Sequence, residues 1–525
     1  MKNSIRLTAV LSAAALLTLG ASMSAFASSK GTWMMVDGER YCYDSNGDIY
    51  ENTFCSSNGS DYYVGDDGTL VRSDWVEYDG DYYFVDSSGK KVVNDWRLVS
   101  PYDDPDADEE WYYFQASGQM ASSKKLTWKG NTYFFDSEGC MLTGWVTSDG
   151  TGTVDEANDA NPDTTYYCGE DGACLKSSWI WSTAPGTDED DADADEYYYY
   201  LKSTGKLATG KVSSIGGQTY LFNEEGQMLS GWVACDGEKY MEIDGEDSSA
   251  VLTSDAYQAV YYCGEEDDGH VKKGRWAKLW RPADAYDEDD DDDKYWYWID
   301  RDGKVFIPSD SNAAFGCLYE LEDASLTFNG SAAITKKKIN SKDYFFNQNG
   351  EMLSDFVEVT AGSSDLAVGM YYFGGEDDGS MKTGSQSVKD DNGDIYKFYF
   401  ATASTTTGES KGAGITGNKS NKLYYKGLLI QAEDYKYQTA TIDGHTFIVN
   451  QSGTIQHSQV QYLESGDVLI DAKTVTENGE TVYEIVYSTA SDQWKYSVDE
   501  EASTGVLKDY NEPIDITAVM NTISE

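Results

Sequence analysis

The chain has 525 residues and carries 92 acidic against 39 basic side chains, which gives a formal net charge of −53. This charge argues against a nucleic-acid-binding role, because such proteins need a basic face that displaces phosphate counterions. The 14 Trp, 41 Tyr and 17 Phe residues argue against a disordered acidic tail, since such tails are poor in aromatic residues. Fifty Gly and seven Pro indicate a chain divided by glycine turns, so internal repeats are the first organisation to test.

The first residues have the pattern of a secretory signal peptide. Lys2 and Arg6 precede an apolar stretch at 7–20, and residues 25–27 (AFA) form a cleavage site of the A-x-A type. The apolar stretch is shorter than the ~18 residues that a membrane-spanning helix needs, and no other stretch is longer. We therefore predict a signal peptide over residues 1–27 and a secreted mature chain without a transmembrane segment, located at the cell surface or in the cell wall. An uncleaved anchor is the alternative.

One short pattern recurs along the chain: two or three aromatic residues, a polar turn that ends in Gly, and then an apolar residue. Thirteen clear copies are present, among them YYFVDSSGKKV at 82, YFFDSEGCM at 133 and YFFNQNGEM at 344. Aromatic residues favour strands, and a polar turn closed by Gly fits a left-handed turn position, so each copy predicts a β-hairpin. A lone hairpin is marginally stable, so neighbouring hairpins must stack.

These hairpins predict an all-β fold. We expect an elongated β-solenoid of stacked aromatic hairpin repeats over residues 28–463, and a small C-terminal β cap or module over 464–525, where the pattern fades. Independent β-sandwich domains are the alternative, but several copies are spaced by only ~20 residues, which leaves room for one hairpin each.

A longer unit is superimposed on the hairpins. Acidic runs at 103–110, 188–196 and 287–293 each lead into an aromatic strand, and then into the phrases GCMLTGWV, GQMLSGWV and GEMLSDFV. The third of these units carries an insertion near 308–335. We predict that the acidic runs are solvated spacers. Calcium binding and attraction of a cationic partner are the alternatives. No other cofactor is predicted, and the Asp-rich turns at 44–48 and 390–394 fail the EF-hand pattern.

The phrases GCMLTGWV, GQMLSGWV and YFFDSEG resemble the cell-wall-binding repeat family, which includes choline-binding and glucan-binding modules and the repetitive regions of glucosylating toxins. The resemblance covers about residues 31–460. It implies a β-solenoid with ligand sites between consecutive hairpins, and attachment to cell-wall polysaccharide, glucan or a choline-bearing polymer. The Gly-Trp pairs at 144–145 and 231–232 lack the following Lys of choline-binding repeats, and the third unit has Asp355-Phe356 instead. These departures favour glucan over choline.

Aromatic side chains are the plentiful chemical resource for binding. Rings stack on the apolar faces of sugars or surround a cation, which is worth ~0.5–2 kcal/mol per cation contact. The alternative is that most of these rings form the packing ladder of the solenoid. The predicted ligand-binding residues form three groups: Trp145 with Tyr133 and Tyr166, Trp232 with Tyr220, and Trp75 with Tyr82 and Tyr83.

Cysteine and histidine usage fits an exported binding protein. Cys168 and Cys174 flank a turn (CGEDGAC), so we predict a disulfide between them, and Cys42 and Cys55 form a second close pair. The three histidines do not lie in any metal-binding or catalytic motif, so we predict no catalytic residue and no enzyme activity.

The predicted function is that of a secreted, non-enzymatic carbohydrate-binding protein that attaches to cell-wall or extracellular polysaccharide. One alternative is a surface adhesin or structural stalk that binds a protein partner. A second alternative is a cell-wall hydrolase with an unrecognised catalytic module.

Overall fold

The computed structural model describes nine stretches of the chain: 31–150, 152–187, 193–243, 252, 257–282, 294–309, 313–322, 325–404 and 409–516. The predicted signal peptide at 1–27, the acidic run at 287–293 and residues 188–192 of the second run lie outside them. The chain divides into two compact units. The first comprises residues up to Ala208 together with Glu225–Gln227, and the second comprises Thr209–Glu224 and the residues from Met228 onward.

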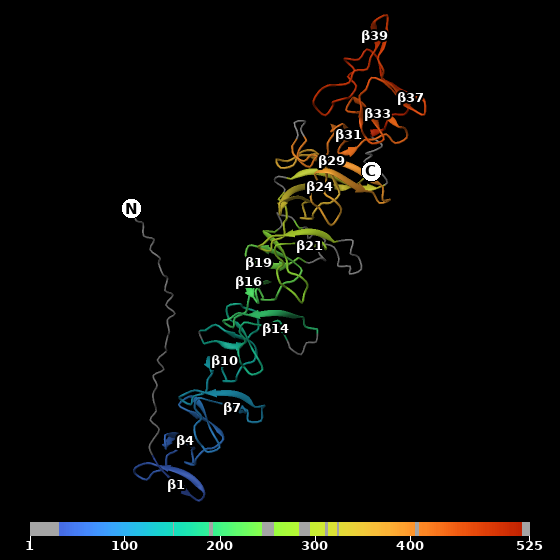
Figure 1. Cartoon of the computed structure of the whole chain (residues 1–525). Helices are drawn as coiled ribbons and strands as arrows, with labels where there is room; N and C mark the ends of the chain where they lie inside the picture. Colours follow the sequence, from blue (N-terminus) through green and yellow to red (C-terminus); the bar gives the residue numbers. More distant parts are fainter. Residues whose placement is uncertain are drawn as a thin grey trace, which may run out of the picture. The chain divides into compact units, whose positions relative to one another are not determined.

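The first unit consists of antiparallel hairpins that follow one another along the chain (Figure 1). Six of its sheets have two strands, and β11 pairs with both β12 and β13. The strands are β1 Thr32–Val36, β2 Glu39–Tyr43, β3 Thr53–Ser57, β4 Ser60–Val64, β5 Asp74–Tyr78, β6 Asp81–Val85, β7 Asp95–Val99, β8 Glu110–Phe114, β9 Lys124–Trp128, β10 Asn131–Phe135, β11 Gly144–Ser148, β12 Val154–Glu156, β13 Thr165–Cys168, β14 Ser178–Thr183 and β15 Glu196–Leu201.

The second unit begins with similar hairpins and continues into wider sheets. Two of these sheets have five strands, ordered β25-β24-β23-β26-β27 and β28-β29-β32-β31-β30. The strands are β16 Gly210–Ile215, β17 Gln218–Phe222, β18 Trp232–Asp236, β19 Lys239–Glu242, β20 Ala259–Tyr262, β21 Arg275–Leu279, β22 Tyr295–Ile299, β23 Ala314–Glu322, β24 Ser325–Ile339, β25 Lys342–Phe346, β26 Phe356–Ala361, β27 Gly369–Tyr372, β28 Gly384–Lys389, β29 Ile395–Phe400, β30 Gly417–Lys419, β31 Lys422–Tyr425, β32 Leu428–Leu429, β33 Tyr437–Ile442, β34 His445–Asn450, β35 Ile455–Gln456, β36 Gln461–Glu464, β37 Asp467–Asp471, β38 Val475–Glu477, β39 Glu480–Tyr483 and β40 Lys508–Asp509.

The predicted all-β hairpin fold is confirmed, and its polar turns are closed by their own side chains. After β6, Asp86 accepts hydrogen bonds at Oδ1 from the backbone N–H groups of Ser88 and Lys90, at 2.8 and 3.0 Å. The same Asx arrangement recurs at Asp44, Asp136, Asp300, Asn347 and Asn450. An Asp or Asn side chain that binds the backbone in this way fixes the turn that the sequence pattern predicted.

Several of the glycines that end the polar turns lie against an apolar residue of a preceding hairpin. A Cβ atom on Gly89 would lie 2.7 Å from Leu70 Cδ1 and 2.9 Å from the carbonyl oxygen of Val71, so only glycine fits there. The contact recurs within the first unit (Gly68 on Ile49, Gly139 on Met120, Gly172 on Met141) and within the second (Gly269 on Met228, Gly303 on Val271, Gly379 on Met352, Gly453 on Leu429). Stacking of hairpins therefore depends on two residues of the repeat pattern: the glycine that ends one turn, and the apolar residue of an earlier hairpin on which that glycine lies.

The insertion of the third repeat unit forms the long hairpin β23–β24. Its register runs from Ala314 opposite Ile334 to Glu322 opposite Ser325, and β24 continues to pair with β25. The insertion therefore widens a two-stranded repeat into a five-stranded sheet.

The C-terminal segment contains short strands with a hydrophobic cluster of their own. Buried Tyr462, Ile470 and Ile485 pack around Ile448 of the hairpin β33–β34. The chain then returns to β33, where Ala440 and Ile514 form a parallel bridge. Residues 517–525 of the predicted cap lie outside the described part of the chain.

All eight cysteines lie in the described residues, and each is a free thiol. Cys168 and Cys174 are direct partners in an antiparallel bridge, so the hairpin brings the predicted pair together. The bond between them is not formed in the structure and stays a prediction. Cys42 and Cys55 are both buried and hydrogen-bond each other, and burial raises the pKa of both thiols.

Candidate functional site

An open pocket in the second unit is lined by side chains from three successive hairpins. The pocket has a volume of about 750 Å³. The hairpin β21–β22 supplies two indoles, β25 and its turn supply a phenol and a thioether, and the turn after β27 supplies three carboxylates. We call this the aromatic–acidic pocket, and its residues are Trp276, Trp296, Lys342, Tyr344, Met352, Gly375, Glu376, Asp377 and Asp378.

The alternation of side chains along β22 explains how the indoles reach the pocket. Tyr297 and Ile299 are fully buried on one face, so Trp296 and Trp298 lie on the opposite face. Trp276 is directly opposite Trp298 in the register, and its ring centroid lies 5.4 Å from that of Trp298 and 4.9 Å from that of Tyr344. The aromatic wall is thus fixed by mutual packing before any ligand is present.

The acidic rim of the pocket is held by hydrogen bonds and ion pairs. Trp296 Nε1 donates to Asp377 Oδ1 at 3.0 Å, and Lys278 Nζ lies 2.8 Å from Glu376 Oε1. The hydrogen bond to Glu376 raises the pKa of Lys278. Burial alone would raise the pKa of Asp378, but hydrogen bonds from Lys382 and Ser380 hold it below the ordinary value. Lys278 and Lys382 thus pair with the three carboxylates, which place acceptor oxygens next to the rings.

The first unit contains a counterpart of the aromatic wall. Trp96 and Trp111 occupy the positions of Trp276 and Trp296 in their hairpin, and Tyr133 and Met141 those of Tyr344 and Met352. The Trp96 and Tyr133 ring centroids lie 5.0 Å apart, close to the 4.9 Å between those of Trp276 and Tyr344. Trp111 is 42% exposed. The same four residue types thus recur in one arrangement in two repeat units.

The three tryptophans that were predicted to bind ligand are packed against neighbouring parts of the chain. Trp145 and Trp232 are each 8% exposed, and Trp75 is half-buried. Each indole N–H donates to a backbone carbonyl where an acidic segment begins, at 2.9 Å for Ser100, 2.9 Å for Thr183 and 3.0 Å for Trp280. Each ring also meets the edge of a fully buried tyrosine: Trp75 meets Tyr112, Trp145 meets Tyr199, and Trp232 meets Tyr297.

The predicted grouping with particular tyrosines is wrong for Trp145 and Trp232, whereas Tyr82 packs on the same cluster as Trp75. Trp145 lies opposite Tyr167 rather than Tyr166, and Trp232 lies opposite Tyr262 rather than near Tyr220. The reason is that successive strand residues face opposite sides of a sheet, so a neighbour in sequence is on the wrong face. Trp75 contacts Phe84 and Phe114 in addition to Tyr112.

The predicted tyrosines are distributed over several clusters. Tyr82 stacks on Tyr102 at 3.9 Å, Tyr83 packs on Phe54, and Tyr166 packs on Phe134. Tyr133 lines the counterpart wall of the first unit. Tyr220 is half-buried and is the third residue of β17, the position of Tyr133 in β10 and Tyr344 in β25. A ligand-binding role for the eight predicted residues stays a prediction.

None of the residues that line this pocket was among the ligand-binding residues predicted from the sequence. The available signal was the alignment of whole repeat units rather than of single hairpins. Comparing DWRLV at 95 with RWAKL at 275, and EWYYF at 110 with YWYWI at 295, aligns the two tryptophan pairs.

A second pocket adjoins the first and shares Trp296, Met352 and Glu376 with it. Its volume is about 430 Å³. The insertion hairpin β23–β24 forms one side, so we call it the insertion pocket. The polar and aromatic residues that define it are Tyr295, Glu320, Asn329, Asn347, Glu351 and Asp355.

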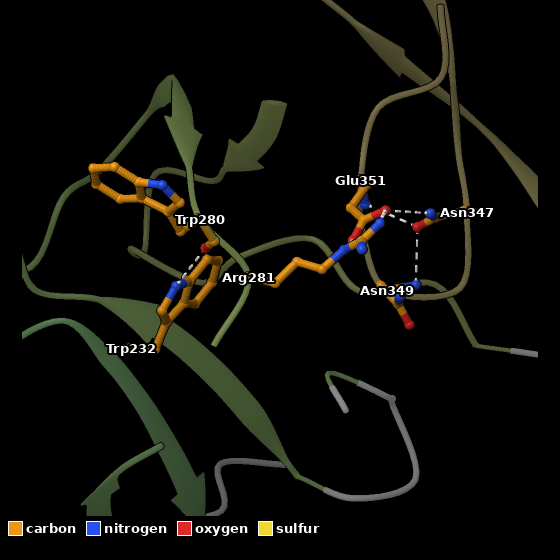
Figure 2. Close-up of polar contacts among 6 residues, drawn as sticks. All are labelled: Trp232, Trp280, Arg281, Asn347, Asn349 and Glu351. Atoms are coloured by element: carbon orange, nitrogen blue, oxygen red, sulfur yellow. Dashed lines mark hydrogen bonds and ion pairs between the residues drawn. The ribbon is translucent and has the colours of Figure 1, made fainter. Parts of the chain in front are cut away.

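A buried ion pair fixes the base of the insertion pocket. Figure 2 shows Arg281 extended towards Glu351, with Asn347 beside the carboxylate. Arg281 Nε and Nη2 lie 2.5 and 3.0 Å from the two carboxylate oxygens, and Asn347 Nδ2 donates to Glu351 Oε2 at 2.6 Å. The Glu351 side chain is only 4% exposed, and the guanidinium lies 4.0 Å from the centre of the Tyr295 ring. A two-point contact of this kind holds both side chains rigidly.

Asp355 occupies a position that is glycine in the two other repeat units. Its φ is +55°, close to the +65° of Gly144 and the +57° of Gly231. Burial raises the pKa of Asp355 to about 6; the hydrogen bond from Ser354 opposes this, and the charges of Glu320 and Glu376 add to it. In the third repeat unit, a partly desolvated carboxyl is thus carried by a residue whose backbone is left-handed. This backbone conformation costs an L residue conformational free energy.

Within the described residues, no group of three or more His, Cys, Asp or Glu side chains is placed to hold a metal ion. Likewise, the part of the chain that the structure describes has no helix that is long and apolar enough to cross a bilayer. Of the acidic segments in which calcium binding was an alternative, 287–293 lies wholly and 188–196 largely outside that part.

Comparison with known proteins confirms the predicted resemblance. The sequence family described as a cell wall binding repeat matches residues 106–120 and 337–352. The chain is 27% identical over 271 residues to glucosyltransferase-S of Streptococcus mutans serotype c, which covers 49% of this chain and 16% of that protein. It is 22% identical over 402 residues to glucosyltransferase-I of Streptococcus downei, which covers 75% of this chain and 21% of that protein. The chain thus spans about a fifth or less of the length of these curated relatives.

Among solved structures, the chain is similar to the modular autolysin LytC from Streptococcus pneumoniae in complex with a synthetic peptidoglycan ligand. The sequence identity is 17%, the match covers 62% of this chain and 52% of that chain, and the TM-score is 0.34.

Proposed function

Because the chain carries cell-wall-binding repeats, which imply association with the cell surface, we propose that it is a secreted, non-enzymatic carbohydrate-binding protein. It attaches to cell-wall or extracellular polysaccharide through the aromatic–acidic pocket. The single observation that carries this proposal is the arrangement of Trp276, Trp296 and Tyr344 around an open pocket between successive hairpins.

Ring faces and carboxylates together suit a sugar. A pyranose offers an apolar face that packs on an aromatic ring, and hydroxyl groups that donate to acceptors beside it. In the pocket, Asp377 lies next to the Trp296 indole, at 3.0 Å from Nε1, so stacking and hydrogen bonding can act on one ring. Both curated relatives are named glucosyltransferases, and for this reason a glucose polymer is the first ligand to test.

The three histidines are not among the lining residues of either pocket, and each contacts a neighbouring side chain. His270 binds Asp268, His445 stacks on Trp494 at 4.2 Å, and His457 stacks on Tyr496 at 3.8 Å. Each imidazole thus has a structural contact with a neighbouring side chain.

A choline-bearing polymer is the second candidate ligand. Aromatic rings next to carboxylates also suit a quaternary ammonium group, which binds over ring faces and is attracted by negative charge. Glu376, Asp377 and Asp378 supply that charge. The two ligands differ in one respect, since an ammonium group needs the carboxylate charge and a neutral sugar needs only acceptor oxygens.

Co-sedimentation tests the proposal. The full chain is mixed with insoluble α-glucan and with purified cell walls, and the bound fraction is measured with and without soluble isomalto-oligosaccharide or choline. We expect retention that Trp296→Ala reduces ~5–150-fold, as for loss of an aromatic contact of ~1–3 kcal/mol. Tyr510→Ala is the control, because Tyr510 is 62% exposed in the C-terminal segment and is not part of either pocket.

The competitor identifies the ligand class. Release by the oligosaccharide, with little effect of Asp377→Asn, supports the polysaccharide. Release by choline, with a strong effect of Asp377→Asn, supports the choline-bearing polymer. Equal retention of the parent chain and Trp296→Ala would refute the pocket as the attachment site.

A further inference from the structure

The insertion pocket has the composition of a polar ligand site, and the fold of the other repeat units does not require it. It exists because β23 and β24 bring Glu320 and Asn329 to the side of the third unit, where Asn329 Nδ2 donates to Glu320 Oε1 at 2.7 Å. Both side chains are exposed at the pocket. Acceptor and donor groups side by side are suited to the vicinal hydroxyl groups of a sugar.

Asp355 adds a carboxyl to the same pocket, at a position where folding alone favours glycine. The equivalent positions are Gly144 and Gly231, and all three have positive φ. An aspartate there bears both a strained backbone and a desolvated carboxyl. The hydrogen bond from Ser354 satisfies Asp355 Oδ2 at 3.1 Å, which leaves capacity for another donor at the carboxyl.

The aromatic side of the insertion pocket is continuous with the first pocket. Trp296, Met352 and Glu376 line both, and Tyr295 precedes Trp296 on β22 and packs under Arg281. Because the Arg281 guanidinium lies over the Tyr295 ring and is itself held by Glu351, the ring is a fixed platform. A chain of sugar rings on Trp276 and Trp296 would therefore meet a second prepared surface as it continued past Trp296.

We propose that the insertion pocket is a second carbohydrate subsite, in which Glu320, Asn329 and Asp355 bind hydroxyl groups of the rings adjacent to those held by the aromatic–acidic pocket. The subsite takes a neutral, hydroxyl-rich polysaccharide, and the hairpin β23–β24 determines which glycan the third unit accepts. This inference rests on the proposed function, because it extends the same ligand beyond the first pocket.

Calorimetric titration with isomalto-oligosaccharides of increasing length tests the inference on the full chain. We expect the affinity to rise when the oligosaccharide becomes long enough to fill both pockets. Glu320→Gln with Asn329→Ala, and separately Asp355→Gly, should remove that rise and weaken the long ligand ~5–50-fold, while the affinity for the short ligand stays unchanged. Asp355→Gly restores the residue of the two other units, so it relieves backbone strain and the chain folds.

A matched control separates the pocket from the backbone effect. Asp79 has a φ of +54° and lies in the tight turn between β5 and β6, so Asp79→Gly makes the same substitution outside both pockets. We expect no change in affinity for this variant. If both insertion-pocket variants bind the long ligand as the parent does, while Trp276→Ala weakens short and long ligands alike, the second subsite is refuted and the proposed function stands. If the parent chain binds neither ligand, both proposals are refuted.

Discussion

The contact between a turn glycine and the preceding hairpin can be tested by two substitutions in one hairpin. Gly80 and Gly89 have nearly equal φ values, +83° and +80°. A Cβ atom on Gly80 would meet nothing within 4 Å, whereas one on Gly89 would lie 2.7 Å from Leu70 Cδ1 and 2.9 Å from the carbonyl oxygen of Val71. Alanine therefore costs the same backbone strain at both positions, and only at Gly89 does it collide with the neighbouring repeat.

The expected magnitudes derive from these geometries. The left-handed conformation costs an L residue ~1–2 kcal/mol, and overpacking a closed contact costs a further ~1–3 kcal/mol. Leu70 is only 4% exposed and Val71 contributes backbone, so neither can move freely. Gly89→Ala should thus destabilise the hairpin by ~1–3 kcal/mol more than Gly80→Ala, which is ~5–150-fold in the opening equilibrium.

Amide hydrogen exchange of β5 and β6 in the full chain measures this difference, because it reports local opening without requiring a single unfolding transition. We expect faster exchange for both variants and a clearly larger effect for Gly89→Ala. Equal exchange in the two variants would refute the idea that the turn glycine is the point where hairpins stack.

An indole hydrogen bond, a cysteine pair and a buried carboxyl can each be tested in the same chain. Trp75→Phe removes the hydrogen bond to the Ser100 carbonyl and should raise exchange of the amides in 100–109 ~3–10-fold, with little change in β1–β4. A thiol-oxidising reagent should join Cys168 to Cys174, which peptide mapping would detect, because direct partners in an antiparallel bridge have the separation a disulfide needs. Burial raises the pKa of Asp355 to about 6, so its contribution to stability is present below pH ~4 and is lost as the pH rises through about 6. Chemical denaturation of Asp355→Asn should lack this loss; the same loss in both proteins would contradict the assignment.

The regular part of the fold could be predicted because it depends on local chemistry. The run D-S-S-G at 86–89 specifies an Asx turn and a left-handed glycine, and the aromatic residues before it specify a strand. The turn and the strand each depend on consecutive residues, so the sequence of one hairpin is enough to recognise the repeat.

The candidate site could not be predicted in the same way, because it depends on which face of a strand each ring occupies and on which hairpins become neighbours. The sequence pattern groups Trp145 with Tyr166, but the register places Tyr167 opposite it. The aromatic–acidic pocket joins Trp276, Tyr344 and Asp377, which together span about a hundred residues of the sequence. A single hairpin repeat does not contain that information, and only the comparison of complete repeat units does.

The replacement of tryptophan by Phe356 is explained by the next hairpin of the chain. Phe356 packs on Phe398 at 5.0 Å, where Trp145 and Trp232 pack on tyrosines and also bind a loop carbonyl. The hairpin that contains Phe398 is closed by the short turn between β28 and β29, so there is no long acidic segment to anchor. An indole N–H is thus present where it binds a carbonyl of a long loop, and it is absent where the next hairpin has a short turn.

Five of the turn glycines lie on methionine thioethers: Gly139 on Met120, and Gly172, Gly269, Gly379 and Gly412 on Met141, Met228, Met352 and Met381. Peroxide or hypochlorite converts a thioether into a sulfoxide, which adds a polar, hydrogen-bond-accepting oxygen to a junction that has no space for a single methyl group. Oxidation of these methionines should therefore disrupt the joints between repeats, and methionine sulfoxide reductases would be the enzymes that restore them.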